Sequence, residues 1–268
     1  DIQSHAHLLK YDTAHGKFDA EISTQDDHFI VNGQKIKYLN TRDPKELPWK
    51  EHNVDVVLEC TGAFRGKKSS EFHIAQGAKK VLISAPGESD IDATVVYGVN
   101  HEILKSTDTF VSNASCTTNG LAPLVKVIQD NLGIKSGVMN TIHSYTNDQS
   151  LLDNMHKDVR RARAASGSMI PTKTGAASAV GLVIPELKGK LDGIAVRVPT
   201  NNVSLVDLTL ISETNTSKDK VNAMMKEASD NSMRGIMVYN DEPLVSIDFN
   251  HTPASCYFDS TLTKVSPD

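Results

Sequence analysis

The sequence is poor in cysteine. Its three cysteines, Cys60, Cys116 and Cys256, are widely spaced along 268 residues. An odd number at such spacing excludes a disulfide framework and does not match the paired ligands of a zinc site. This cysteine usage is typical of a reducing compartment, so we expect a cytoplasmic protein that holds no metal ion.

Long apolar runs and positive net charge are also lacking. No apolar run approaches the roughly 18 residues of a membrane span. The formal net charge of −5 provides no global positive field for nucleic acid, and the basic cluster at 160–163 reads as a solvated or ion-paired face. We therefore expect neither a membrane nor a nucleic acid among the partners.

The length and composition are those of a soluble globular protein. Hydrophobic residues make up 39% and charged residues 23% of the sequence, enough for one large domain or two ordinary ones. Residues 1–5 read like the interior of a domain, and residues 264–268 follow directly on a strand-like run. We therefore expect a fragment of a longer protein that lacks both termini.

The first part of the sequence alternates short apolar strands with turns and a helix. Strands are predicted at 29–31 and 34–38 around Asn32-Gly33, which is a strong hairpin signal. A strand at 54–59, a helix at 68–75 and a strand at 80–84 follow the parallel crossover pattern of open α/β sheets. Ligands lie beyond the carboxyl ends of such strands, which makes Thr61, Gly62 and Ser84 candidate cofactor contacts.

The pattern changes after Cys116. Longer strand-like runs and few helices follow it, and they suggest an α+β domain on a mixed or antiparallel sheet. These strands are predicted at 137–143, 193–198, 203–212, 235–239 and 254–258, with a helix at 218–229. The irregular stretch 148–177 is long enough to indicate a functional or interface loop. We predict an incomplete Rossmann-like dinucleotide-binding domain at 1–115 and a catalytic domain at 116–268.

Cys116 is the strongest catalytic candidate. It lies between an apolar strand-like run and a helix-like stretch, and its neighbours are hydroxyl and amide residues. A thiol at the amino end of a helix meets unpaired backbone N–H groups and a positive dipole, which favour the thiolate. A buried, inert cysteine is the ordinary alternative, but the polar neighbours argue against it.

A reactive thiol needs a base and, here, partners for anions. His143 ends an apolar strand before a polar run, and a Cys–His pair both activates the thiol and moves a proton. Arg197, within an apolar strand, must pair with an acid or face a pocket, and we favour the pocket. Thr174-Gly175 precedes a helix-like stretch whose free amides suit a phosphate. Hydroxyl donors are added by Ser115, Thr117 and Thr146.

Several ordered motifs resemble the phosphorylating glyceraldehyde-3-phosphate dehydrogenase family over essentially the whole chain. They are Ser-Asn-Ala-Ser-Cys-Thr-Thr-Asn at 112–119, His-Ser-Tyr-Thr-Asn-Asp-Gln at 143–149, Arg-Arg-Ala-Arg-Ala-Ala-Ser at 160–166, Thr-Lys-Thr-Gly-Ala-Ala at 172–177 and Val-Arg-Val-Pro-Thr-Asn-Asn-Val-Ser at 196–204. The run at 11–18 and Ser-Ala-Pro at 84–86 belong to the same resemblance.

The resemblance implies a reaction and a set of roles. The expected reaction is NAD-dependent oxidation and phosphorylation of D-glyceraldehyde 3-phosphate to 1,3-bisphosphoglycerate in glycolysis, through a thioester on Cys116 with His143 as base. The substrate phosphate would be held by Thr146, Arg161 and Arg197, and inorganic phosphate by Ser115, Thr117, Thr174 and Gly175. The expected NAD contacts are Arg42, Thr61, Gly62 and Ser84. The family also implies a homotetramer.

Three alternatives stay open on the residues. The nearest is erythrose-4-phosphate dehydrogenase, a sister enzyme that departs from this chain at Thr-Gly-Ala-Ala and at Ser-Tyr-Thr-Asn-Asp-Gln. A Cys–His hydrolase would leave Arg197 and the two phosphate-like sites without purpose. A non-enzymatic binding protein on the same scaffold would not need Cys116, His143 and Arg197 together.

Overall fold

The computed structural model describes residues 1–266, so the last two positions of the expected catalytic domain lie outside the described residues. Contacts divide the chain into two compact units. Unit 1 comprises Asp1–Val57 and Ser70–Val81, and unit 2 comprises Leu58–Ser69 and Leu82–Asp268. Each unit is described by itself.

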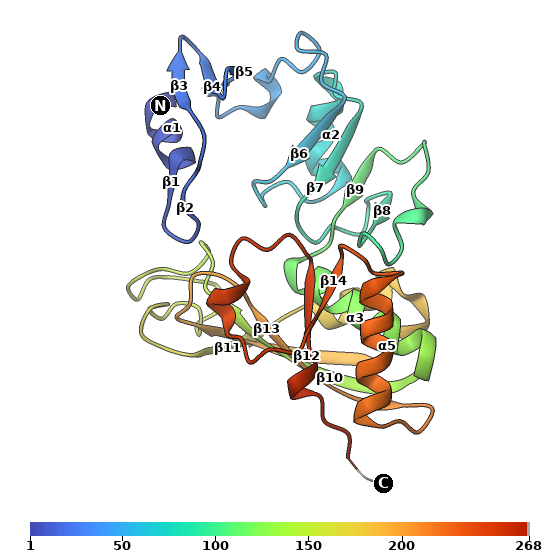
Figure 1. Cartoon of the computed structure of the whole chain (residues 1–268). Helices are drawn as coiled ribbons and strands as arrows, with labels where there is room; N and C mark the ends of the chain where they lie inside the picture. Colours follow the sequence, from blue (N-terminus) through green and yellow to red (C-terminus); the bar gives the residue numbers. More distant parts are fainter. Residues whose placement is uncertain (267–268) are drawn as a thin grey trace. The chain divides into compact units, whose positions relative to one another are not determined.

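Unit 1 begins with a helix and two small antiparallel sheets (Figure 1). Its elements are α1 (Ile2–Lys10), β1 (Tyr11–Asp12), β2 (Gly16–Lys17), β3 (Ile22–Gln25), β4 (His28–Val31), β5 (Gln34–Lys37) and the 3-10 helix η1 (Pro44–Glu46). The predicted hairpin is confirmed, because β4 pairs antiparallel with β5 across Asn32-Gly33. Both turn residues have positive φ, 48° and 81°, as this tight hairpin connection requires.

A further sheet has the strand order β6-β7-β9-β8. Its elements are β6 (Val56–Glu59), α2 (Lys67–Ala75), β7 (Lys80–Ile83), β8 (Ala93–Thr94), η2 (His101–Ile103) and β9 (Phe110–Ser112). The chain passes between the two units at points within β6, α2 and β7. The expected strand, helix and strand are confirmed to within two residues at each end. Strands β8 and β9 run parallel. Non-sequential neighbours of this kind require crossover connections.

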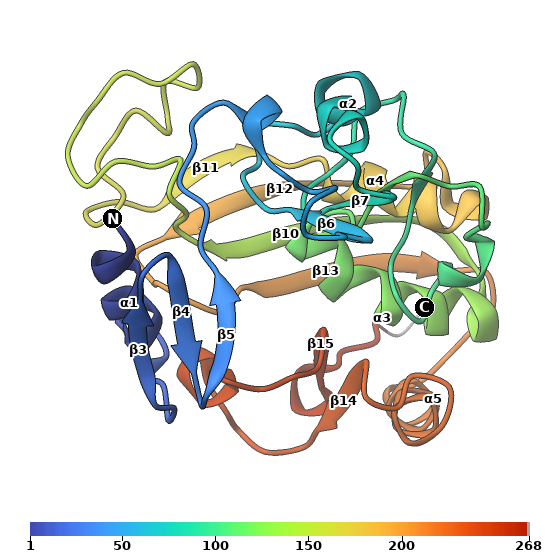
Figure 2. The same cartoon turned by 90° about the horizontal axis from the view of Figure 1, so that it is seen from above.

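The rest of unit 2 is built on a four-stranded mixed sheet with the order β11-β12-β10-β13 (Figure 2). Its strands are β10 (Ile134–Ser144), β11 (Ile170–Lys173), β12 (Leu191–Val198) and β13 (Leu205–Ser212). Strand β10 is parallel to β12 and antiparallel to β13, so the expected mixed sheet is confirmed. The parallel register places His143 directly beside Arg197.

Helices cover one face of this sheet. The remaining elements are α3 (Cys116–Leu132), α4 (Ala176–Val183), η3 (Pro185–Leu187), α5 (Lys218–Asp230), β14 (Met237–Asn240), η4 (Ser246–Phe249), β15 (Cys256–Asp259) and η5 (Ser260–Leu262). The core joins the apolar faces of α3, α4 and α5 to the inner side of the sheet, with Leu121, Val180 and Met225 fully buried. This packing fixes the amino end of α3 against β10.

Several elements were not predicted, among them α1, β11 and the short strands β1, β2, β3 and β8. Helix α1 buries no residue, and it depends on its cap, in which the Asp1 side chain accepts from the amide of Ser4. Strand β11 lies inside the stretch expected to be irregular and pairs with β12. Strand β11 is only four residues long and contains Pro171, so it gives little strand signal in the sequence.

Candidate active site

A strained turn carries Cys116 to the first position of α3. Ala114, just before the helix, has φ +56°, a left-handed conformation that costs a non-glycine residue roughly 1–2 kcal/mol. The turn is held by the Ser112 hydroxyl, which accepts from the amide of Ala114 at 3.0 Å. Ser115 is the N-cap and accepts from the amide of Thr118 at 3.0 Å. Strain of this kind is typical of functional sites.

The thiol of Cys116 faces the ring of His143. Cys116 Sγ lies 3.4 Å from His143 Nε2, and His143 is only 7% exposed. His143 Nδ1 lies 2.6 Å from the backbone oxygen of Ser144. A carbonyl oxygen can only accept, so Nδ1 carries a proton. In the neutral imidazole the lone pair is therefore on Nε2, directed at the thiol.

This pairing makes Cys116 unlike the other two cysteines. The hydrogen bond with His143 lowers the pKa of the Cys116 thiol to about 7, although packing around the sulfur opposes the shift. The charge of His143 and hydrogen bonds from Thr117 act in the same direction as the His143 bond. Cys256 is buried, and burial alone raises the pKa of its thiol to about 12. Cys60 is exposed.

Labelling at pH 7 is expected to distinguish the three thiols. Iodoacetamide reacts with the thiolate, so the activated Cys116 should be alkylated at least about tenfold faster than the exposed Cys60. Cys256 should react only after unfolding. Peptide mass spectrometry over a time course measures the three rates, and equal rates at Cys60 and Cys116 would contradict an activated thiol.

Arg197 lies beside His143 and shares an acceptor with it. Arg197 Nη1 donates to the backbone oxygen of Ser144 and to Thr146 Oγ1, both at 2.9 Å. The oxygen of Ser144 thus accepts from both His143 and Arg197. Within the described residues, Arg197 Nε is buried without a hydrogen-bond partner. A buried, unsatisfied guanidinium N–H is costly unless a ligand completes it.

Asp148 links Thr146 to Arg161 in this site. It was not among the residues predicted from the sequence. Its carboxylate accepts from the Thr146 hydroxyl and, at 2.5 Å, from Arg161 Nη1. Hydrogen bonds from Thr146 and Arg161 hold the pKa of Asp148 below its usual range, although burial, the largest influence, opposes them. The basic cluster is ion-paired at this point, since Arg163 likewise pairs with Asp153. The feature of the sequence that could have identified Asp148 is its position, two residues after Thr146.

A second strained residue supports the strand end that carries His143. Val203 has φ +61°, which is rare for a β-branched side chain. Its backbone oxygen accepts from the Ser144 hydroxyl at 2.7 Å. The amide of Ser144 donates in turn to the Ser204 hydroxyl at 3.2 Å. Ser144 is therefore tied on both sides, and its carbonyl is held for His143 and Arg197.

The residues expected around inorganic phosphate occupy two helix ends. Ser115 caps α3, and Thr117 is a buried residue of its first turn. Thr174 accepts from the amide of Ala176, and Gly175 is the N-cap of α4 with no side-chain cap bond. Helices α3 and α4 pack against each other. Their amino ends offer backbone amides and hydroxyls of the kind that bind anions.

The expected cofactor residues follow strand ends, except Arg42. Thr61 and Gly62 come just after β6, where the buried Glu59 carboxylate accepts from the Thr61 amide at 2.9 Å. Ser84 follows β7, and its amide donates to the backbone oxygen of Glu59 at 3.0 Å. Gly62 has φ +72° with nothing within 4 Å of its missing Cβ, so a ligand can approach this backbone closely. Arg42 is exposed and belongs to unit 1.

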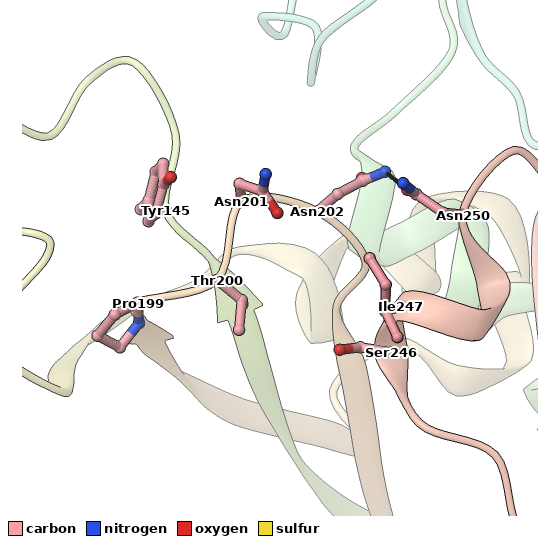
Figure 3. Close-up of a pocket in the computed structure, with 8 residues that line it drawn as sticks. All are labelled: Tyr145, Pro199, Thr200, Asn201, Asn202, Ser246, Ile247 and Asn250. Carbon is pink, nitrogen blue, oxygen red and sulfur yellow. Dashed lines mark hydrogen bonds between the residues drawn. The ribbon is translucent and has the colours of Figure 1, made fainter. Parts of the chain in front are cut away.

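A cavity of about 290 Å³ opens beside the strand ends that carry His143 and Arg197 (Figure 3). Tyr145 stands on one side of it, and Asn202 and Asn250 are hydrogen-bonded to each other on the other. The Tyr145 amide donates to the oxygen of Thr200 at 3.2 Å. The lining is mainly polar and uncharged, so the charged groups of the site lie outside this cavity.

No helix within residues 1–266 is both long and apolar enough to cross a bilayer. The same residues hold no cluster of three or more His, Cys, Asp or Glu side chains arranged for a metal ion.

Comparison with known proteins identifies the family. Residues 115–268 match the glyceraldehyde 3-phosphate dehydrogenase C-terminal domain, and residues 1–67 match its NAD binding domain. The chain belongs to the glyceraldehyde-3-phosphate dehydrogenase family. The expected family and fold class are thereby confirmed: a Rossmann-like NAD-binding domain is followed by a catalytic domain on a mixed sheet.

Glyceraldehyde-3-phosphate dehydrogenases of several bacteria are similar to this chain over nearly its whole length. The plasmid enzyme of Cupriavidus necator is 60% identical over 263 residues, which are 98% of this chain and 78% of that relative. The Pseudomonas aeruginosa enzyme is 56% identical over 99% of this chain and 79% of its own. Glyceraldehyde-3-phosphate dehydrogenase 2 of Bacillus subtilis is 52% identical over 98% of this chain and 77% of that relative.

Proposed function

We propose that this chain oxidises and phosphorylates D-glyceraldehyde 3-phosphate to 1,3-bisphosphoglycerate with NAD, as in glycolysis. One observation carries the proposal: Cys116 Sγ lies 3.4 Å from His143 Nε2. The relatives reported above carry the glyceraldehyde name, so the erythrose alternative is not proposed.

The Cys–His pair performs the two covalent steps. The Cys116 thiol passes its proton to His143 Nε2, the thiolate adds to the aldehyde carbon, and the imidazolium protonates the resulting oxyanion. His143 Nε2 takes this hydroxyl proton back as the carbon is oxidised. When bound, NAD supplies the two-electron oxidant for this carbon. The acyl group is then a thioester of Cys116, and an oxygen of inorganic phosphate attacks its carbonyl carbon. The C–S bond breaks, the acyl phosphate leaves, and the thiolate is restored. Amides at the amino end of α3 stabilise the oxyanion.

Two anion sites are part of the proposal. Thr146, Arg161 and Arg197 are proposed to hold the substrate phosphate, supported by the buried, unpartnered Nε of Arg197. Ser115, Thr117, Thr174 and Gly175 are proposed to hold inorganic phosphate, supported by the two helix amino ends. Anions bind favourably at such ends because of free N–H groups and the helix dipole.

The cofactor contacts proposed for NAD are Arg42, Thr61, Gly62 and Ser84. The open backbone at Gly62 and the position of Thr61 and Ser84 after strand ends fit a dinucleotide, because such ligands bind beyond carboxyl strand ends. Arg42 is proposed from the family resemblance alone. The division into domains after residue 115 is also proposed, and it is supported by the start of the C-terminal family match at 115.

A homotetramer in the cytoplasm is the proposed working form. The face of the mixed sheet opposite its helices carries Val138, Ile194, Leu205 and Ile211, each at least 52% exposed. A row of exposed apolar side chains across three strands is typical of an interface. The three free cysteines agree with a reducing compartment.

The activity is tested by following the reduction of NAD with purified protein. We expect turnover that requires both glyceraldehyde 3-phosphate and inorganic phosphate, with arsenate able to replace phosphate. The rate with erythrose 4-phosphate should be at least about tenfold lower. Ester hydrolysis without NAD, in the absence of any NAD reduction, would instead support a hydrolase.

A further inference from the structure

Asp148 uses both carboxylate oxygens on residues proposed to bind the substrate phosphate. Oδ1 accepts from the Thr146 hydroxyl, and Oδ2 accepts from Arg161 Nη1. A third group, His156 Nε2, lies 3.9 Å from Oδ2. Nothing in the proposed reaction requires this carboxylate. It is an anion already present within an anion site.

The hydroxyl of Thr146 has one hydrogen, and its use can be assigned. A carboxylate only accepts, so the hydrogen of Thr146 Oγ1 is donated to Asp148. Arg197 Nη1 then donates to a lone pair of the same oxygen. Thr146 has no O–H left for a phosphate oxygen. Arg161 is engaged further, because its Nε donates to Thr172 Oγ1 at 3.0 Å.

Two guanidiniums at this site also need a counter-charge. Burial, followed by the neighbouring charge of Arg161, holds the pKa of Arg197 below its usual value, and Asp148 and Cys116 oppose this shift. The Arg161 and Asp148 side chains are 19% and 38% exposed, so this ion pair is partly shielded from water. Its charges act more strongly than those of a fully solvated pair.

We propose that Asp148 is a resident competitor of the substrate phosphate, which must displace its carboxylate to gain the Thr146 hydroxyl and the Arg161 guanidinium. This inference rests on the proposed function. Asp148 keeps the cationic site assembled and neutralised while it is empty. It also weakens the binding of phosphate, because the ligand replaces existing charge-assisted bonds rather than forming new ones.

Because Asp148 competes only with a phosphate group, its effect on affinity depends on whether the ligand is phosphorylated. A phosphorylated aldehyde must displace the carboxylate, whereas an unphosphorylated aldehyde has no group that competes with it. Asp148 therefore sets the affinity for the phosphate group specifically. It acts through Thr146 and Arg161 and is a positioning residue, not a catalytic one.

The test is calorimetric titration of the 268-residue chain with inorganic phosphate. In Asp148→Asn the charge is removed while an acceptor oxygen for Thr146 remains, so we expect phosphate to bind about tenfold more tightly, the effect of one charge-assisted bond. The KM for glyceraldehyde 3-phosphate should fall, and the KM for unphosphorylated glyceraldehyde should not. Loss of a purely structural residue would weaken binding instead.

Two further variants test whether the gain in phosphate affinity arises from Asp148 and at the site that includes Arg197. Asp153→Asn removes the same kind of arginine pair from the same loop, but Arg163 and Asp153 are 68% and 60% exposed, so we expect less than a twofold change. Combining Asp148→Asn with Arg197→Ala should abolish the gain, because the freed phosphate site includes Arg197.

Each result decides the matter. Unchanged or weaker phosphate binding in Asp148→Asn would overturn the inference, as would a gain that persists in the double variant. The titration needs neither NAD nor turnover. A wild-type chain that reduces no NAD would therefore refute the proposed function while leaving the titration decisive for Asp148.

Discussion

Replacing Cys116 by serine is expected to lower turnover of glyceraldehyde 3-phosphate by roughly 10⁴-fold or more, the scale on which loss of a nucleophile acts. The thiol has a pKa of about 7 in this site, so close to half of it is thiolate at neutral pH. A serine hydroxyl in the same place stays protonated at any working pH. Steady-state reduction of NAD measures the loss.

The matched control is Cys60→Ser, which removes the other exposed thiol. Its turnover should stay within twofold of the wild type. Circular dichroism and thermal unfolding should not distinguish the two serine variants, since the change in volume is small. Retention of more than about one per cent of the activity in Cys116→Ser would show that another group forms the covalent intermediate.

Local features of this site could be predicted from the sequence. The start of α3 at Cys116 follows from the hydroxyl N-cap Ser115 and the apolar periodicity after it. The end of β10 at His143–Ser144 follows from the change from apolar to polar residues. The open amino end of α4 after Gly175 follows from the same kind of reasoning. Each of these signals lies within a few residues of the feature it predicts.

Non-local features could not be predicted from such patterns. The distance between Cys116 and His143 depends on how α3 packs on β10, and the register of β10 with β12 places Arg197 beside His143. Asp148 was missed because an acid in a polar loop is ordinary until its partner Arg161, thirteen residues away, is seen to reach it. The family resemblance supplied the roles of the site residues. The tautomer of His143, in contrast, follows only from the contact of its Nδ1 with the backbone oxygen of Ser144.

Replacing His143 by asparagine is expected to produce two separable effects. The pKa of the Cys116 thiol should rise from about 7 toward the ordinary value, because the hydrogen bond with His143 is the largest cause of its lowering. Alkylation of Cys116 by iodoacetamide at pH 7 should then slow by roughly 10- to 30-fold, following the thiolate fraction. Turnover should fall by about 10²- to 10⁴-fold, the range expected for loss of a general base.

The pH dependence separates activation of the thiol from proton transfer. Raising the pH to about 9 ionises the thiol in the variant, so its alkylation rate should approach that of the wild type. Turnover should not recover, because no group remains at 3.4 Å from the sulfur to accept the hydroxyl proton. His28→Asn, which changes a surface histidine paired with Asp27, is the control and should leave both profiles in place. Recovery of turnover together with alkylation at high pH would mean that His143 only lowers the pKa of Cys116 and is not the base.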